Sequence, residues 1–306
     1  MNGIYKIPRI AVEIDPPEKG AGKSEFLIDS ANALKQAGAD AVTIADNPTS
    51  RVRADSVVMA SRVWRETGIK VIPHLTCRDR TREGLQSALL ALDAEGLSTV
   101  LAVTGDPVSA EKRSSPVQSH FPARWSSIQL ASAISEWNVS SFEKPMTVCG
   151  ALNVNAVNFR AELARALKKK AAGMSVFMSQ PVSTSRALDN LYLARETLGC
   201  TVLAGILPIV SAKNALFLSS AKIRGISIDQ HIVKTFENAP REDWTQLGIS
   251  LASEQATKAL DACDGIYLIT PFCRVDISTA IVRALRAEQN IPTSEPTFDH
   301  IETKAG

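Results

Sequence analysis

Polar side chains recur along this chain at the carboxyl ends of short apolar runs, where a buried β-strand has little use for them. The segment KVIPHLTCRDR, residues 70–80, begins as such a run and then places His74, Thr76 and Asp79 close together. Comparable groups end or follow the other runs: Glu13, Thr43, Thr104, Asp106, Asn155, Gln180, Asn214 and Arg274. Carboxylates, amides, hydroxyls and one imidazole suit acid–base catalysis or the recognition of a polar heterocycle better than covalent hydrolysis.

Glu13 is the hardest of these residues to explain by structure alone. It interrupts the apolar run IAVEI, and the burial of a carboxylate is costly unless something uses it. The other positions have ordinary structural explanations. His74 fits a core histidine, Gly105–Asp106 a turn and Asn155 a helix cap. Lys168–Lys169 fits a solvated helix face, and Arg274 fits a surface ion pair. The sequence therefore singles out Glu13 as the first catalytic candidate.

Several other kinds of chemistry lack their motifs. The four histidines are isolated and no His-x-x-x-His pair occurs, so no metal site is predicted. Neither Gly-x-Ser-x-Gly nor a P-loop is present. The five cysteines are scattered without a Cys-x-x-Cys pair, which argues against a zinc knuckle or a disulfide framework. A reduced, cytoplasmic protein is the plain expectation.

Composition narrows the range of partners. The chain has 306 residues, is 45% hydrophobic and carries a formal net charge of +2. A protein dedicated to nucleic acid or to a membrane surface would usually show a basic stripe, so neither partner is expected. No apolar segment approaches the roughly 20 residues that span a bilayer, and the first ten residues lack the apolar region of a signal peptide.

Short apolar runs alternate with longer amphipathic stretches almost from end to end. The runs that predict strands are residues 9–15, 40–46, 70–77, 99–106, 146–153, 174–181, 201–209 and 265–270. A helical pattern follows each run, and a further one covers residues 242–264, before the last strand. Continuously apolar strands that alternate with helices imply a parallel sheet covered by helices.

Eight such units favour an α/β fold, a single (β/α)8 TIM barrel with an extra helical stretch before the last strand. No Gly-x-Gly-x-x-Gly follows the first strand, which weakens the alternative of an open dinucleotide-binding sheet. We expect one domain over residues 1–306, with loose ends at about 1–8 and 290–306. Active sites of parallel barrels lie at the carboxyl ends of the strands, where the polar residues of this chain also fall.

At these residues the sequence resembles the methylenetetrahydrofolate reductase family. VEIDPP, HLTCRDR, VTGDP, MSQP and GILPI are similar to that family's motifs, in the same order and at predicted strand ends. The resemblance extends from about Ile10 to about Leu285. Within the family, the reductase halves of bifunctional homocysteine methyltransferase–reductase proteins look most similar, since they share YLITPF as well.

The resemblance implies a flavoprotein that interconverts 5,10-methylenetetrahydrofolate and 5-methyltetrahydrofolate by hydride transfer through FAD. It assigns Glu13 as the general acid near the folate N10 and Asp106 to the flavin pyrimidine and the pterin. It assigns Gln180 and Asn214 to the folate, and Arg274 is our candidate for a glutamate or nucleotide contact. The implied flavin contacts are Thr43, His74, Thr104, Gly105, Asp106, Asn155 and either Lys168 or Lys169, because the alignment can slip by one residue.

The sequence departs from the family pattern at several positions near the cofactor. Thr104 stands in place of an arginine, and Pro181, Val182 and Leu218 stand in place of aromatic residues that would stack on nicotinamide or folate. The electron donor is therefore open between NADH, NADPH and an electron-donating partner protein, and so is a homo-oligomeric state. Two alternatives to the reductase are a flavin-free, folate-dependent methyltransferase barrel and a non-catalytic folate-binding subunit.

Overall fold

The eight predicted strands close into a barrel in the computed structural model, which describes residues 9–18, 24–106, 125–220, 223 and 225–289. The strands are parallel and neighbours in the sheet follow the chain order, with the last strand paired to the first. Their bounds are β1 Ile10–Ile14, β2 Ala41–Ile44, β3 Lys70–Thr76, β4 Thr99–Val103, β5 Thr147–Leu152, β6 Met174–Pro181, β7 Thr201–Ile206 and β8 Gly265–Ile269. The predicted TIM barrel is thus confirmed.

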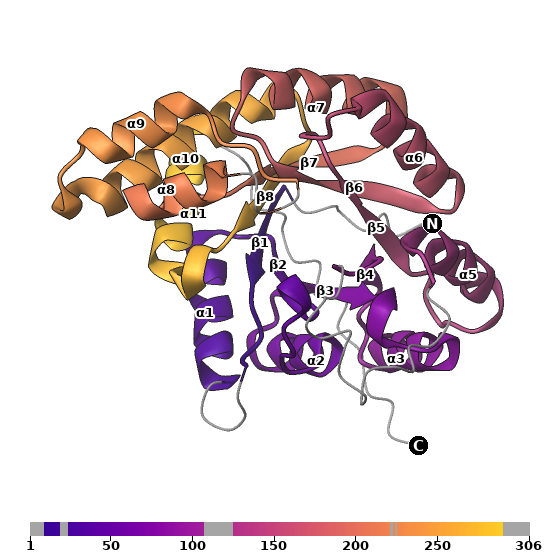
Figure 1. The fold of residues 1–306 in the computed structure, drawn as a ribbon. Helices are drawn as coiled ribbons and strands as arrows, with labels where there is room; N and C mark the ends of the chain where they lie inside the picture. The colour runs from indigo at the N-terminus through magenta and orange to yellow at the C-terminus, as the bar shows by residue number, and fades with distance from the viewer. Residues whose placement is uncertain (1–8, 19–23, 107–124, 221–222, 224, 290–306) are drawn as a thin grey trace, which may run out of the picture.

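Helices surround the barrel (Figure 1). Their bounds are α1 Ser24–Ala37, α2 Ser56–Thr67, α3 Arg82–Ala94, α5 Ser127–Ser140, α6 Phe159–Ala171, α7 Ser185–Leu198, α8 Ala212–Ser219, α9 Gln230–Asn238, α10 Trp244–Leu260 and α11 Val275–Gln289. Polar side chains fix where several of them begin; Asp55 accepts hydrogen bonds from two amides of α2, and Ser126 forms a capping box with Gln129 in α5. None of the described helices is long and apolar enough to cross a membrane.

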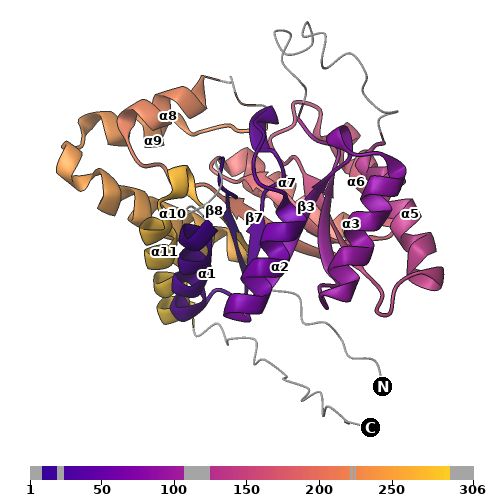
Figure 2. The same cartoon turned by 90° about the horizontal axis from the view of Figure 1, so that it is seen from below.

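The seventh unit differs from its predicted arrangement. The helical pattern over residues 212–225 ends early, as α8, and α9 follows as a helix that the sequence analysis did not predict. These two helices share a small apolar cluster around Ile209 and Phe236 and project from one side of the barrel (Figures 1 and 2). The stretch predicted as the extra one, α10, packs against β7, β8 and α11, so it serves as a barrel helix and α8–α9 form the insertion.

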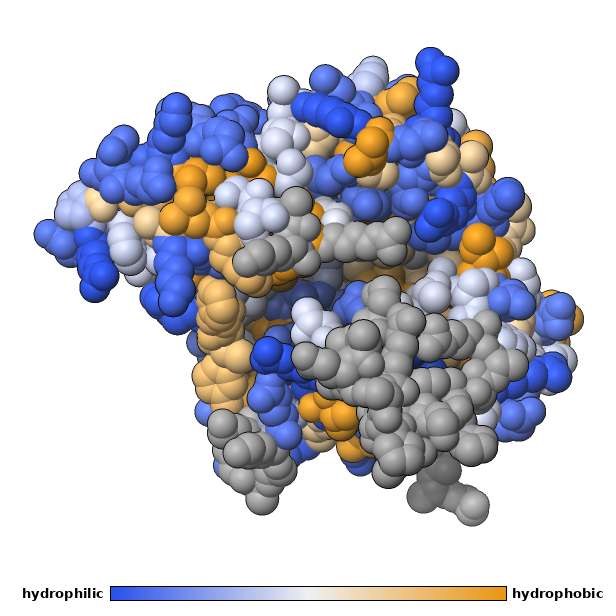
Figure 3. Space-filling model, in the orientation of Figure 1, coloured by the Kyte–Doolittle hydropathy of each residue, from blue (hydrophilic) through white to orange (hydrophobic). Residues whose placement is uncertain are grey.

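The apolar core has two shells. The larger shell lies between the outer faces of the strands and the helices, and includes fully buried Leu34, Leu89 and Ile134. The smaller one fills the inside of the barrel with one or two side chains from each strand: Ala11, Ala41, Ile72, Leu101, Cys149, Val176, Met178, Leu203 and Tyr267. Since side chains alternate along a strand, Glu13, Thr43 and His74 point the same way, one layer closer to the carboxyl ends. The molecular surface seen in Figure 3 is mainly hydrophilic, with smaller apolar groups between.

Candidate active site

Three predicted site residues from three neighbouring strands meet inside the mouth of the barrel. The His74 Nε2 lies 3.2 Å from the Thr43 Oγ1 and 3.6 Å from the Glu13 Oε2. The same Glu13 oxygen accepts a hydrogen bond from the Tyr267 hydroxyl of β8. Thr43 and His74 are buried, and Glu13 is largely so. Strand register brings these groups together, because β1 pairs with both β2 and β8.

The surroundings of Glu13 favour its protonated form. Burial raises the pKa of Glu13, and the hydrogen bond from Tyr267 opposes that rise. Burial also lowers the pKa of His74 to about 4, so the imidazole is neutral near pH 7 and supplies no positive charge to the carboxylate. The cluster is therefore a weakly solvated carboxyl group among neutral partners, which is the environment that a general acid working near neutral pH requires.

Asp15 lies just beyond Glu13, where the chain leaves β1. Burial, followed by the nearby charge of Glu13, raises the pKa of Asp15. The guanidinium of Arg53 pairs with Asp15 at 3.4 Å and with Glu18 at 3.1 Å, and it also donates to the Pro16 carbonyl at 2.9 Å. Arg53 thereby ties the loop after β2 to the loop after β1.

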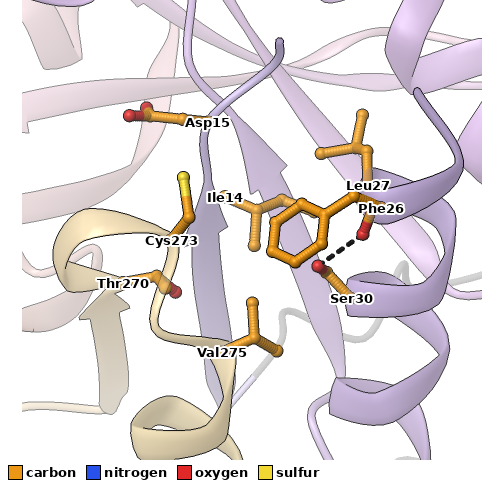
Figure 4. A pocket seen from close by; sticks show the side chains of 8 residues that line it. All are labelled: Ile14, Asp15, Phe26, Leu27, Ser30, Thr270, Cys273 and Val275. Atoms are coloured by element: carbon orange, nitrogen blue, oxygen red, sulfur yellow. Dashed lines mark hydrogen bonds between the residues drawn. The ribbon is translucent and has the colours of Figure 1, made fainter. Parts of the chain in front are cut away.

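A narrow pocket opens beside Asp15, between α1 and the segment that follows β8 (Figure 4). Most of its lining is apolar, with Ile14, Phe26 and Val275 among its residues. In this segment Phe272 and Cys273 have positive φ angles of 49° and 58°, and residue Phe272 is 73% exposed. The pocket shares Asp15 with the surroundings of Glu13, but Glu13 itself does not line it.

Asp106 is held at a second corner of the mouth, after β4. Its Oδ2 accepts a hydrogen bond of 2.8 Å from the Thr49 amide, and its carbonyl accepts one of 2.9 Å from the Arg78 guanidinium. Arg78 is buried and also bonds to Ser50 at 2.9 Å and to Asp79. The Asp106 side chain itself is exposed, so its carboxylate faces the solvent side of the mouth.

Gly105 allows the chain to pass close to this corner. Its φ angle is +95°, and a Cβ atom there would lie 2.5 Å from the Thr76 Cγ2 and 2.8 Å from the Arg78 Cβ. A side chain at this position would therefore push Asp106 away from β3. Next to it, the Thr104 Oγ1 accepts a 3.1 Å hydrogen bond from the amide of Ser127, at the start of α5.

Across the mouth from Glu13, the predicted cofactor contact Asn155 forms hydrogen bonds with backbone carbonyls. The Asn155 amide group donates to Pro181 at 2.8 Å and to Gly225 at 2.9 Å. Gly225 also approaches Gln180, since a Cβ atom on it would lie 3.2 Å from the Gln180 Cγ. Asn155 thus helps to hold Gly225 close to Gln180.

The two candidate lysines differ in environment. The Lys169 side chain is buried, its ammonium donates to the Ala151 carbonyl of β5, and burial lowers its pKa. Lys168, the next residue of α6, is exposed.

Asn214 and Arg274 both have local partners. The Asn214 Oδ1 accepts a 3.3 Å hydrogen bond from the Val210 backbone amide. The backbone amide of Asn214 donates to the Ser211 hydroxyl at 3.1 Å. Arg274 forms an ion pair of 2.6 Å with Asp276, as the structural alternative for this residue anticipated. None of these hydrogen bonds and ion pairs joins Asn214 or Arg274 to the Glu13 cluster.

Arg53 and Tyr267 escaped the sequence analysis, and Arg78 was noted only as part of the segment CRDR. Tyr267 lies in the apolar run GIYLIT, where a tyrosine resembles core, although its hydroxyl needs a partner once buried. The segment CRDR did point to chemistry around Arg78, but did not indicate that its cation would lie beside Asp106. Within the part of the chain that the structure describes, His, Cys, Asp and Glu side chains form no group of three or more that could hold a metal ion.

Comparison with known families decides which family the chain represents. The sequence model of the methylenetetrahydrofolate reductase family matches residues 5–285. This chain belongs to the methylenetetrahydrofolate reductase family. The match confirms the resemblance seen in the strand-end motifs and includes Glu13, His74 and Asp106 within its bounds.

Individual relatives of the chain are distant. The protein of Buchnera aphidicola subsp. Acyrthosiphon pisum (strain APS) named 5,10-methylenetetrahydrofolate reductase is 22% identical over 256 residues, which is 82% of either chain. The crystal structure of 2,3-dimethylmalate lyase, a PEP mutase/isocitrate lyase superfamily member, has a TM-score of 0.50 at 11% identity, over 94% of this chain and 85% of that one. This second likeness concerns the fold alone.

Proposed function

We propose that this member of the family is a flavin-dependent oxidoreductase that interconverts 5,10-methylenetetrahydrofolate and 5-methyltetrahydrofolate. The observation that carries the proposal is the place of Glu13, a carboxyl group at the barrel mouth that contacts Tyr267 and the uncharged His74 and whose pKa is raised by burial. Family membership supplies the substrate class, and the same reaction is implied by the name of the Buchnera relative.

In this reaction Glu13 moves one proton. When the methylene bridge of the folate opens, the bond between its carbon and N10 breaks, and N10 takes the proton from the Glu13 carboxyl group. In the opposite direction the Glu13 carboxylate takes the proton back from N10 as that bond forms. Burial raises the pKa of Glu13, which favours the protonated form that gives its proton to N10.

The barrel mouth suits FAD on the side of β2, β3 and β4. Thr43, His74, Thr104, Gly105 and Asp106 lie there, and a flat ring with polar edges needs hydroxyl, imidazole, amide and carboxylate partners of this kind. The turn at Gly105, which has no room for a Cβ atom, keeps Asp106 at the rim. When bound, FAD would accept a hydride from an electron donor and deliver it to the one-carbon unit.

The remaining proposed cofactor contacts come from the loop after β5 and from α6. Asn155 is proposed to face the cofactor from the β5 side, with Lys168 or Lys169 near the diphosphate. Lys168 is exposed and could reach a ligand directly, whereas Lys169 would first have to leave the Ala151 carbonyl.

We assign the folate to Gln180, Asn214 and Asp106, with Arg274 near its glutamate. Because Pro181, Val182 and Leu218 replace aromatic side chains, the proposal admits NADH, NADPH or a partner protein as the electron donor.

Flavin binding can be tested on the purified protein. We expect a yellow protein with flavin absorbance bands, or a colourless one that acquires them when it is incubated with FAD and then freed of excess ligand. Asp106→Asn should weaken FAD retention, and exposed Asp189→Asn on α7 is the control. A protein that cannot be loaded with FAD under any condition, yet binds methyltetrahydrofolate, would replace the reductase by the flavin-free methyltransferase or the folate-binding subunit.

A further inference from the structure

Tyr267 reaches the Glu13 cluster from the layer beneath it. In the strand register Tyr267 lies beside Ala11, whereas Glu13 lies beside Ile269. The phenol ring is buried in the inner core next to Ala11 and Ala41, whose small side chains leave room for it. The ring therefore rises along the inside of the barrel, and its hydroxyl ends at the level of Glu13 rather than in the apolar layer.

The hydroxyl contacts one particular oxygen of the carboxyl group. It donates to Glu13 Oε2, which is also the oxygen that faces His74 at 3.6 Å. Thr43 of β2 also acts on the phenol, since its side chain lowers the pKa of Tyr267 against the larger effect of burial. Both described contacts of the Glu13 carboxyl group thus fall on Oε2, and Oε1 is the oxygen available to a ligand at the mouth.

We propose that Tyr267 is a positioning residue for the general acid: its hydroxyl anchors Oε2 of Glu13 and directs Oε1 towards the folate. This assignment rests on the proposed function in so far as folate is the proton acceptor. The anchoring itself is a property of the protein without any ligand. Tyr267 also sets how readily Glu13 ionises, because an O–H group that donates to a carboxylate stabilises the charged form.

The other groups around Glu13 do not stabilise its charged form. Asp15, just beyond the end of β1, adds a negative charge that Arg53 partly offsets. On β3, His74 is uncharged near pH 7, and Asp46 lies close enough to influence it. Among the facing groups, the phenol is therefore the one whose direct hydrogen bond lowers the pKa of Glu13.

Carbon-13 NMR of protein labelled at the glutamate carboxyl carbons tests the anchoring without flavin or folate. The Glu13 signal is identified by its loss in Glu13→Gln. In Tyr267→Phe, which keeps the ring, the Glu13 titration midpoint should move upward by about one to two pH units. Tyr192→Phe, on the exposed face of α7, should leave it unchanged. An unchanged midpoint in a folded Tyr267→Phe would overturn the proposal.

A second measurement covers the case in which Tyr267→Phe does not fold. Glu13 raises the pKa of Tyr267, after burial as the larger cause. Ultraviolet titration of Glu13→Gln should therefore show one tyrosine that ionises at a lower pH than in the unmodified protein. An unaltered tyrosine titration would contradict the contact.

The kinetic readout separates this inference from the proposed function. In Tyr267→Phe the alkaline limb of the pH profile for folate turnover should move upward with the Glu13 midpoint, while flavin reduction keeps its profile. A shifted midpoint in a protein that does not turn over folate would leave the anchoring intact and refute the reductase. Folate turnover with an unshifted midpoint would refute the anchoring alone.

Discussion

Replacement of Glu13 by glutamine should lower folate turnover by about 10²- to 10⁴-fold, the range that general acid catalysis contributes. Glutamine keeps the size of the side chain and can still accept the hydrogen bond from Tyr267, but it has no proton to give to N10. Flavin reduction by an electron donor needs no proton at that position. Its rate should stay within a factor of about two of the unmodified protein, because the proposed FAD contacts remain in place.

Rapid mixing can measure the two half-reactions separately. Glu25→Gln is the matched control, since Glu25 lies exposed in the first turn of α1, away from the barrel mouth. It should change neither half-reaction. If Glu13→Gln retains folate turnover at a similar rate, the proton comes from another group and the assignment of the acid is wrong.

The second large effect concerns acid stability through His74. Its pKa is about 4 in the folded protein, compared with 6.5 for the free side chain, because burial disfavours the imidazolium. Between these two values the unfolded chain binds a proton that the folded chain does not, so the free energy of unfolding falls as the pH falls from 6.5 to 4. The pKa difference corresponds to roughly 3 kcal/mol over that window.

Urea unfolding at several pH values between about 4 and 7 measures this loss. His74→Gln removes the titrating group, so its free energy of unfolding should fall less over that range, by roughly 3 kcal/mol, than that of the unmodified protein. His231→Gln, at an exposed position in α9, should retain the full loss. Glu13 affects the free energy of unfolding in the opposite direction, because its raised pKa favours the folded state at low pH. This effect is present in all three proteins. Parallel curves for His74→Gln and the unmodified protein would mean that His74 is not held neutral.

The barrel was predictable because each strand is apolar along its length and each helix is amphipathic, which are local properties of the sequence. The seventh unit was not, because residues 212–225 and 242–264 both carry helical patterns. Only packing decides which of them covers β7 and which projects outward. The short turn after β8 was also missed, since its positive φ angles at Phe272 and Cys273 occur at residues other than glycine.

In a parallel barrel the carboxyl ends of the strands lie together, and this rule predicted that Glu13, Thr43 and His74 are close to one another. It did not predict Tyr267, which lies 254 residues from Glu13 in the sequence and meets it only because β8 closes the barrel against β1. The contacts of Asn155 and Lys169 with backbone carbonyls could not be predicted either. Carbonyl groups are present at every residue, so the sequence carries no sign of which one a side chain will reach.

An anaerobic absorbance spectrum of the FAD-loaded protein, taken before and after the addition of methyltetrahydrofolate, tests the proposed hydride transfer from the folate to the flavin. We expect the flavin bands to bleach in the unmodified protein and to persist in Glu13→Gln on the same timescale. Bands that persist in the unmodified protein, although dithionite bleaches them, would show that this flavoprotein does not oxidise methyltetrahydrofolate.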